Sequence, residues 1–439
     1  MDKSTFNKAE GIVIDDLDNG VFKVNRRAFS DPDILEAERR QVFDQSWLYV
    51  GHGSEIPEPG CFVKRNVGGR PLIFVHSRDG NIRCFFDTCT HRGNSVCRGN
   101  AGKVNRFTCF YHGWSFDTDG ELKVVPDPAG YGKNFDKKAL SLKSPPRVEH
   151  YRNMYFMSMK EDIVDLDTYL GGAKKYIDDM LDVTTSEPIV APGQQTYSMN
   201  TNWKLLMENS ADAYHGPFTH RRFFQDYLKD MGADLGDWKS LLEDQGDNHV
   251  RTFEYGHAII DTPAGPLPMA ADTPQMLDEL RADLTDKHGA ERASELLDRS
   301  RNLLIFPNLV LIAAWRTIRT LYPVSTDYLE CNAWAIVGKD DSEAMRDMRF
   351  SNFIAFLGPG GFGTPDDNEA LDGCQEGFYA REVEWTDLSR GMLREGGALA
   401  NDELQMRSIW RRWNELMNPG TKTPVELSKA MVDEAKSGS

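Results

Sequence analysis

The stretch DTCTHRGNSVCRGNAGKVNRFTCFYHGWSF, residues 87–116, contains two short arms that each carry one cysteine and one histidine. The arms, separated by seventeen residues, are Cys89 with His91 and Cys109 with His112. Structural zinc sites mostly pair like ligands, with two cysteines on one arm and two histidines on the other. A mixed pair on each arm suits a [2Fe–2S] cluster in which two cysteines hold one iron and two histidines hold the other. We therefore expect a redox cluster here, with zinc as the alternative.

The residues beside the two arms fit such a cluster. Gly93, Gly102 and Gly113 allow tight loops whose backbone N–H groups can point at sulfur. Tyr111 and Trp114 are expected to shield the cluster from water. Because neutral histidine ligands raise the potential of a cluster above that of all-cysteine clusters, this site is suited to passing single electrons onward. An electron acceptor is therefore expected elsewhere in the chain.

Short β-like segments surround the arms over residues 46–125, separated by Gly, Asn and Asp turns such as SRDGN and TDGE. This pattern predicts a small antiparallel all-β module with the cysteines and histidines on its loops. We assign residues 46–158 to it, and residues 1–45 and 159–439 to a second, larger domain.

The larger domain is predicted to be α+β, because its strands are grouped and helices lie before and after them. A helix leading into a strand is expected at residues 28–50, a β-rich stretch at 305–357, and helices at 164–182, 203–214, 273–304, 380–415 and 424–436.

Composition limits the possible partners. The net charge of −17 argues against nucleic acid or an anionic membrane surface, since both need clustered Lys and Arg. The first twenty residues lack the apolar run of an export signal, and the longest apolar stretch, 303–315, is too short to span a bilayer. Seven cysteines at irregular spacing suit a reduced compartment. We expect a soluble cytoplasmic protein in which Cys61, Cys84, Cys97, Cys331 and Cys374 are packing residues.

A second motif, NWKLLMENSADAYHGPFTHRRF, begins at Asn202. Within it, Glu208, Asp212 and His215 are spaced i, i+4, i+7, which would place them on one face of a helix.

His220 follows His215 after five residues, and Gly216 and Pro217 between them are expected to break the helix and turn His220 back. Two histidines would then converge beside Asp212. Two histidines and one carboxylate, with open positions for oxygen, form the facial triad of non-haem Fe(II) oxygenases. Taken alone, a His-x₄-His pair is more often two ordinary core or surface histidines. An adjacent redox cluster favours iron.

The combination of C-x-H-x₁₇-C-x₂-H with E-N-x-x-D-x-Y-H-x₄-H resembles the large (α) subunit of Rieske non-haem iron ring-hydroxylating oxygenases. The resemblance covers nearly the whole chain, including LIFPNLVLIAAWRTIRTLYPV and FLGPGGFGTPDDNEALDGCQEGF. It implies an α+β fold of helix-grip type, with a small all-β Rieske module and a catalytic domain built on a central antiparallel sheet flanked by helices.

The resemblance also implies roles for individual residues. The cluster ligands would be Cys89, His91, Cys109 and His112. The mononuclear iron would be held by His215, His220 and Asp367, with Asp366 as the second choice for the carboxylate. Asp212 would bridge the two centres, Asn209 would be a polar neighbour of the iron, and Tyr214 a packed neighbour. The plain alternative for the two aspartates of TPDDNEAL is a helix start, where acidic residues favour the helix dipole. The glycines of GPGGFG would let the backbone approach the iron.

The implied activity is that of a terminal oxygenase. Electrons from NAD(P)H would arrive through a reductase or ferredoxin, and O₂ would be used to cis-dihydroxylate an aromatic ring. The subunits would form a head-to-tail homotrimer, possibly α₃β₃ with a small β subunit. Within it, His112 of one chain would pass electrons through Asp212 and His215 of the next.

The motif between Glu208 and His215 is one residue shorter than in naphthalene-type enzymes and is similar to benzoate- and cumate-type subunits. This favours an aromatic carboxylate as substrate, in a site lined by residues around 305–322 and 352–357. Candidate residues for binding the carboxylate, by position only, are Arg316, Arg319, Arg221 and Arg222.

Three other functions stay open at this point: a Rieske monooxygenase that hydroxylates or demethylates an aromatic compound, a Rieske electron-transfer protein, and a zinc-stabilised binding protein.

Overall fold

In a computed structural model of the chain, residues 9–230, 249–263, 273–421 and 423–437 are described. The chain divides into two compact units, one comprising Met1–Val42 with Tyr169–Ser439 and the other Phe43–Thr168. The second unit begins three residues before the predicted module (43 against 46) and ends ten residues after it (168 against 158). The first twenty residues were predicted to contain no export signal. Of these, residues 1–8 lie outside the described part of the chain.

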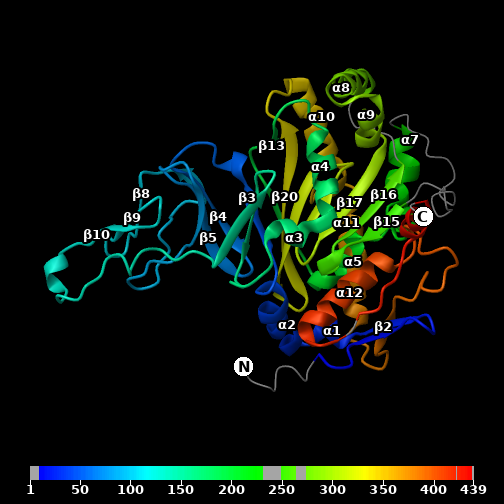
Figure 1. The fold of residues 1–439 in the computed structure, drawn as a ribbon, viewed down its shortest axis with the longest axis horizontal. Coiled ribbons are helices and arrows are strands. Elements are labelled where there is room, and N and C mark those ends of the chain that lie inside the picture. The colour runs from blue at the N-terminus through cyan, green and yellow to red at the C-terminus, as the bar shows by residue number, and fades with distance from the viewer. Residues whose placement is uncertain (1–8, 231–248, 264–272, 422, 438–439) are drawn as a thin grey trace. The chain divides into compact units, whose positions relative to one another are not determined.

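The Phe43–Thr168 unit consists of three small antiparallel sheets with strand orders β6-β5-β4-β7, β10-β9-β8 and β11-β12-β3 (Figure 1). The strands are β3 Leu48–His52, β4 Cys61–Val67, β5 Arg70–His76, β6 Ile82–Phe86, β7 Ala101–Lys103, β8 Arg106–Thr108, β9 Ser115–Asp117, β10 Leu122–Val124, β11 Arg147–Tyr151 and β12 Met154–Ser158. Gly68 and Gly69, both with positive φ, form the two-residue turn of the β4–β5 hairpin. The predicted all-β module is confirmed.

The larger unit is built on an eight-stranded antiparallel sheet with the order β13-β20-β19-β18-β17-β16-β15, and β14 also pairs with β20. Its strands are β13 Pro188–Val190, β14 Gln195–Met199, β15 His249–Thr252, β16 Ala258–Pro263, β17 Arg299–Ile305, β18 Leu309–Ile312, β19 Thr317–Ser325 and β20 Tyr328–Gly338. A separate three-stranded sheet contains β1 Val13–Asp16, β2 Val21–Asn25 and β21 Trp385–Asp387.

Helices flank the eight-stranded sheet, as the predicted fold class requires (Figure 1). Helices α4, α5 and α12 contact strands among β15–β19, and α10 contacts β20. The helices of this unit and the link into it are α1 Arg27–Ser30, α2 Pro32–Glu38, α3 Leu166–Leu170, α4 Lys174–Asp182, α5 Trp203–Ser210, α6 Gly216–Thr219, α7 Leu228–Asp230, α8 Thr273–His288, α9 Ala290–Leu297, α10 Glu343–Leu357, α11 Gly363–Gly377, α12 Leu404–Met417 and α13 Lys429–Ser437.

Several of the predicted element limits are wrong; among them, the helix expected from residue 424 begins at Lys429. The helix expected to reach residue 304 ends at Leu297, because 299–305 pair as β17 between β16 and β18. The β-rich stretch ends at Gly338, and α10 follows because Ser342 caps it by accepting from the N–H of Met345. Residues 380–403 are not a helix; three glycines there adopt positive φ, and α12 begins only at Leu404.

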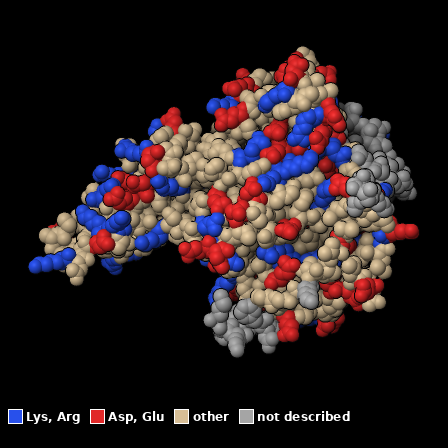
Figure 2. Space-filling model, viewed as in Figure 1, with Lys and Arg blue, Asp and Glu red and all other residues tan. Residues whose placement is uncertain are grey.

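The surface in view carries both signs of charge, interspersed over both units, rather than one basic field (Figure 2). Among the described residues, no helix is long and apolar enough to cross a membrane.

A buried charge network fixes the start of α5, the helix that leads to the second motif. Lys204 Nζ lies 2.7 Å from Glu38 Oε1, and both side chains are almost fully buried. The indole N–H groups of Trp203 and Trp413 donate to the same carboxylate, each at 2.7 Å. Because a buried carboxylate is costly unless it is paired and hydrogen-bonded, these three donors together hold α5 against α2 and α12.

Replacing Lys204 by Met should therefore destabilise the larger unit by about 3–5 kcal/mol, since it leaves Glu38 charged, buried and without its cation. Urea unfolding followed by tryptophan fluorescence measures this loss. The double variant Glu38→Gln, Lys204→Met should recover a large part of the stability, and a double variant as unstable as the single one would contradict the explanation.

Candidate functional site

The two Cys/His arms lie on two loops with the same backbone hydrogen bonds. In the first loop the N–H of Cys89 donates to the carbonyl of Asn94, and the N–H of Gly93 donates to the carbonyl of Cys89. In the second loop the N–H of Cys109 donates to the carbonyl of Trp114, and that of Gly113 to the carbonyl of Cys109. Both glycines have φ above +70°, which favours glycine. Gly102, by contrast, lies in strand β7 and makes no loop.

The four side chains on these loops match the donor set of a [2Fe–2S] cluster. The rings of His91 and His112 are 4.6 Å apart, and the Nδ1 atom of each is buried without a hydrogen-bond partner among the described residues. A buried ring nitrogen left unpaired is rare unless it serves a ligand, so these two atoms fit metal coordination. The sulfur of Cys109 accepts from the side-chain amide of Asn94 at 3.7 Å.

The two cysteines differ in how readily they ionise. Burial raises the pKa of Cys89. Burial also opposes ionisation of Cys109, but N–H donation from Tyr111, His112 and Asn94 outweighs it and lowers the pKa of this thiol. Hydrogen bonds to a thiolate favour the form that binds metal.

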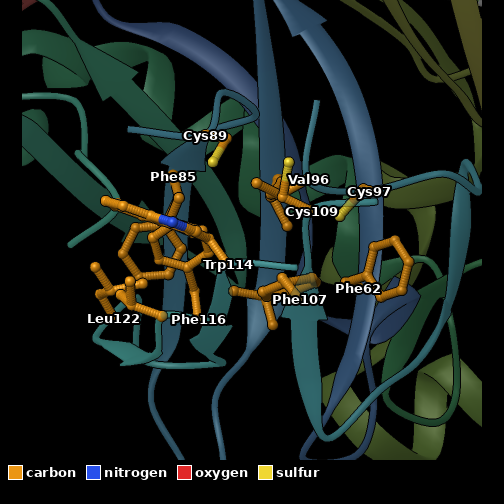
Figure 3. Close-up of a cluster of buried hydrophobic side chains, with 14 residues drawn as sticks. Phe62, Phe85, Cys89, Val96, Cys97, Phe107, Cys109, Trp114, Phe116 and Leu122 are labelled. Atoms are coloured by element: carbon orange, nitrogen blue, oxygen red, sulfur yellow. The ribbon is translucent and has the colours of Figure 1, made fainter. Parts of the chain in front are cut away.

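The hydrophobic core of this unit supports the loops from one side. Cys89 and Cys109 are 3% and 2% exposed and belong to a buried cluster that includes Trp114, and Figure 3 shows both sulfur atoms on the same side of it. The Trp114 ring stacks on His91 at 4.8 Å. Tyr111, expected to shield the cluster, is 53% exposed, and its ring lies 3.8 Å from that of His112.

Asp87 was not predicted as a site residue, but its contacts fix the loop that carries Cys89 and His91. Its buried carboxylate accepts from the N–H groups of Val96 and Cys97 and from the Ser95 hydroxyl, and it pairs with Lys64 at 2.8 Å. A lone acidic residue directly after the apolar run IRCFF was the available signal.

The second motif does not form one continuous helix. Helix α5 ends at Ser210, so the prediction that Glu208, Asp212 and His215 share one helix face is wrong. Asp212 comes close to His215 through a turn in which its Oδ1 accepts from the N–H of Tyr214 at 2.7 Å. The break precedes Gly216 and Pro217, which instead begin the short helix α6.

His215, His220 and Asp367 come together, and their ligand atoms all lie within 4.8 Å of one another. Asp367 Oδ1 is 3.4 Å from His215 Nε2 and 3.2 Å from His220 Nε2. His220 is 3% exposed and Asp367 5%. Two imidazoles and one carboxylate aimed at one point match the donor set of a non-haem iron site.

Carboxylates also face the opposite nitrogen of each histidine. Asp212 Oδ2 lies 3.2 Å from His215 Nδ1, and Asp366 Oδ2 lies 3.5 Å from His220 Nδ1. Such partners favour a proton on Nδ1 and leave the Nε2 lone pair for the metal. Asn209 donates to Asp367 Oδ1 at 3.0 Å, so it orients the carboxylate itself.

Charge is strongly coupled within this group. Burial opposes the charge on His215, but Asp212 and Asp367 outweigh it and raise the pKa of His215 to about 10, so a metal bound at Nε2 would take the place of a proton there. Burial likewise opposes ionisation of Asp367, yet His215 and His220 hold its pKa well below the usual range. The carboxylate is therefore ionised at neutral pH, as a metal ligand must be.

A cluster of aromatic rings, the aromatic wall, lies beside His220. The segments that contain Trp315 and Phe356 were predicted to line the site, but these residues were not singled out. The ring of Phe356 lies 4.9 Å from His220, 4.6 Å from Trp315 in a stacked arrangement, and 4.7 Å from Phe223. These residues come from α10, from the turn before β19 and from the segment after α6. These buried rings give the site an apolar border on the His220 side.

The glycines of GPGGFG have a packing role in the structure. A side-chain carbon at Gly361 would meet the carbonyl oxygens of Ile354, Ala355 and Phe356 at 2.6–2.8 Å. One at Gly363 would meet the Phe356 ring at 2.6 Å. They therefore let α11 begin directly against the end of α10, which sets the position of Asp367.

Several predicted residues lie away from the ligand group. Tyr214 is 37% exposed and its ring lies under the Arg390 guanidinium at 4.1 Å, so only its backbone N–H contributes to the site, by donating to Asp212.

Among the five cysteines expected to be packing residues, Cys84, Cys97 and Cys331 are buried, Cys61 is partly buried and Cys374 is exposed.

Comparison with known proteins identifies the class. Residues 46–146 match the Rieske [2Fe-2S] domain, and residues 166–418 match the ring hydroxylating alpha subunit (catalytic domain). The fold is similar to that of naphthalene 1,2-dioxygenase with indole bound in the active site, with a TM-score of 0.80, 24% identity and coverage of 98% of this chain and 97% of that one. The chain therefore belongs to the family of ring-hydroxylating alpha subunits.

Its similarity to curated proteins narrows the class further. It is 32% identical to the 2-halobenzoate 1,2-dioxygenase large subunit of Burkholderia cepacia, over 85% of this chain and 81% of that protein. It is also 32% identical to the toluate 1,2-dioxygenase subunit alpha of Pseudomonas putida, over 87% of this chain and 84% of that protein. The protein is a Rieske non-haem iron dioxygenase alpha subunit of the benzoate-like branch, with a [2Fe–2S] cluster and a mononuclear iron as its cofactors.

Replacing Asp367 by Asn should strip the mononuclear iron while leaving the visible absorption of the cluster unchanged, because an amide is neutral and a weak ligand for iron. The matched control is Asp366→Asn in the same helical turn, which should keep the iron. Iron and acid-labile sulfide analysis of both purified variants makes the comparison. Iron loss in the Asp366 variant alone would reverse the two assignments.

Glu208 is an unusual carboxyl group one residue before Asn209. Its Oε1 accepts from the Trp410 indole at 2.5 Å. Burial raises the pKa of Glu208 to about 8, partly opposed by Trp410 and reinforced by the charges of Glu403 and Asp212. The folded protein thus keeps this group protonated at pH values where the unfolded chain, with an ordinary pKa of about 4.3, has lost the proton.

This difference predicts a pH dependence of stability. Between about pH 4.3 and pH 8 the folded state binds the extra proton, so the Glu208 contribution to stability falls as pH rises, at about 1.4 kcal/mol per pH unit. In Glu208→Gln, which keeps an oxygen for Trp410, this fall should be absent. Urea unfolding of both proteins at pH 5, 6, 7 and 8 tests it; parallel stability curves would contradict the raised pKa.

Proposed function

We propose that this protein is the terminal oxygenase component that cis-dihydroxylates the ring of an aromatic carboxylate, such as a substituted benzoate or cumate. The observation that carries the proposal is the convergence of His215, His220 and Asp367 within 4.8 Å, beside the aromatic wall. The choice of a carboxylate is supported by the names of two relatives, a 2-halobenzoate and a toluate dioxygenase.

In this proposal the chain's own residues bind the metals, orient the aromatic substrate and exclude water. When bound, the cluster supplies single electrons and the mononuclear iron supplies the activation of O₂. Cys89, His91, Cys109 and His112 would hold the cluster, and His215, His220 and Asp367 the iron. Asn209 keeps the Asp367 carboxylate in place, and the rings of Phe356 and Trp315 position the arene and exclude water.

Electron delivery is proposed to run between subunits. Asp212 touches His215 Nδ1 while its side chain stays 19% exposed, so one face of this carboxylate is open to a partner. In the proposed head-to-tail homotrimer, that partner is His112 of a neighbouring chain. The electrons come from NAD(P)H through a reductase or ferredoxin, a small β subunit completes an α₃β₃ assembly, and the enzyme works in the cytoplasm.

Asp212→Ala should leave the cluster spectrum intact and the mononuclear iron bound, but reduce turnover by at least about 100-fold, since the proposed link from His215 to the donor histidine is removed. Stopped-flow reduction of the cluster followed by product analysis separates the two steps. Normal product formation in this variant would remove Asp212 from the electron path.

The substrate class is tested by turnover of benzoates, cumates and neutral arenes with a surrogate reductase under ¹⁸O₂. The proposal expects carboxylates to be the best substrates and both labelled atoms to enter the product as a cis-diol. A product with one labelled atom would instead assign the protein as a monooxygenase, and exclusive turnover of neutral arenes would refute the carboxylate.

A further inference from the structure

Three of the four arginines considered for substrate binding have other positions or partners. Arg319 is 3% exposed and donates to the Ser210 hydroxyl at 2.6 Å, which ties β19 to the end of α5. Arg221 is exposed and donates to Gln225, and Arg222 is exposed as well. These three side chains support the scaffold or face solvent.

Arg316 occupies an unusual backbone position. It ends the turn between β18 and β19, where its N–H donates to the carbonyl of Ala313 at 3.2 Å and its carbonyl accepts from the N–H of Ile336 at 2.8 Å. Its φ is +50°, in the left-handed region that side chains other than Gly, Asn and Asp rarely adopt. A strained residue held by its surroundings is more often found at functional sites than elsewhere.

No described residue supplies a counter-charge to the Arg316 guanidinium. Two other arginines lie near it, and each already has an acid: Arg349 pairs with Asp341 at 2.8 Å, and Arg301 with Asp261 at 3.2 Å. Within the described parts of the chain, Arg316 makes no ion pair or side-chain hydrogen bond of its own. Burial, reinforced by Arg349 and Arg301, lowers the pKa of Arg316 to about 9.

The residue before Arg316 packs against a ring that lies beside an iron ligand. The preceding residue, Trp315, stacks on Phe356 with an interplanar angle of 13°, and Phe356 packs against the ring of His220. One turn of the chain thus carries both Trp315, which stacks on the ring beside His220, and a cation for which the described residues supply no anion. An aryl carboxylate has the matching pair of features, a flat apolar ring and a planar anion.

From this arrangement we infer that Arg316 is the residue that binds the carboxylate of the substrate and selects it over neutral arenes. The inference rests on the proposed function and deepens it. A guanidinium presents parallel N–H donors that match the two oxygens of a carboxylate, and the substrate would supply the counter-charge that the protein withholds. Arg316 would be a specificity residue.

The test compares Arg316→Asn, Arg316→Lys and wild type on matched substrates: the carboxylate that wild type oxidises fastest and its neutral carboxamide. Asparagine tolerates the left-handed backbone, so this variant removes the cation without adding strain. The control is Arg346→Asn, an exposed arginine of α10 that donates to the carbonyl of Lys339. Iron and sulfide content and the thermal unfolding midpoint are measured for every protein.

Arg316→Asn should lower kcat/KM for the carboxylate about 100-fold, mainly through KM, and change that for the carboxamide less than about threefold. Arg316→Lys should lie between it and wild type, and the control should match wild type. The unfolding midpoint of Arg316→Asn should equal or exceed that of wild type, because an unpaired cation and a strained residue are both removed.

Two results would overturn the inference alone: carboxylate turnover that survives Arg316→Asn, or equal losses on the carboxylate and the carboxamide with a lowered unfolding midpoint. Wild-type enzyme that oxidises neutral arenes but no carboxylate would overturn the proposed substrate class, and this inference with it.

Discussion

The catalytic unit depends on one ionised carboxylate, Asp367, held between two imidazoles in a nearly dry position. A buried carboxylate must be compensated, and here His215, His220 and Asn209 supply the compensation that a metal would share. The same requirement explains the local backbone: α11 begins tightly against α10 through Gly361 and Gly363, and the Thr364 hydroxyl donates to the carbonyl of Leu357. The glycines therefore serve the site by fixing a helix start.

In both candidate metal centres, neighbouring residues orient the histidine rings. In the smaller unit, two loops with the same hydrogen bonds leave the Nδ1 atoms of His91 and His112 without a partner among the described residues, and Trp114 stacks on the His91 ring. In the larger unit, Asp212 and Asp366 face Nδ1 and leave Nε2 directed at Asp367. The Nδ1 atoms of His215 and His220 likewise lack a hydrogen-bond partner among the described residues, so in this unit the nearby carboxylates orient the rings by charge.

The sequence allowed the fold class and the ligand candidates to be predicted because both rest on local patterns: short strands with turn residues, and Cys, His and Asp at characteristic spacings. Predictions from the sequence were wrong where contacts between distant residues determine the local structure. Helix α5 stops at Ser210 and an Asp212 turn replaces it, which no 3.6-residue period reveals. Asp87, Phe356 and the isolation of Arg316 depend on residues distant in the chain, so only the structure brings them into view.

One chain is predicted to hold both a histidine-ligated cluster and a separate iron on His215, His220 and Asp367. Iron and acid-labile sulfide analysis of the purified, reconstituted protein, with EPR of the reduced state, tests this most directly. Three irons and two sulfides per chain, with one iron lost selectively in His215→Ala, is the predicted result. Two irons and two sulfides, unchanged by that substitution, would contradict it.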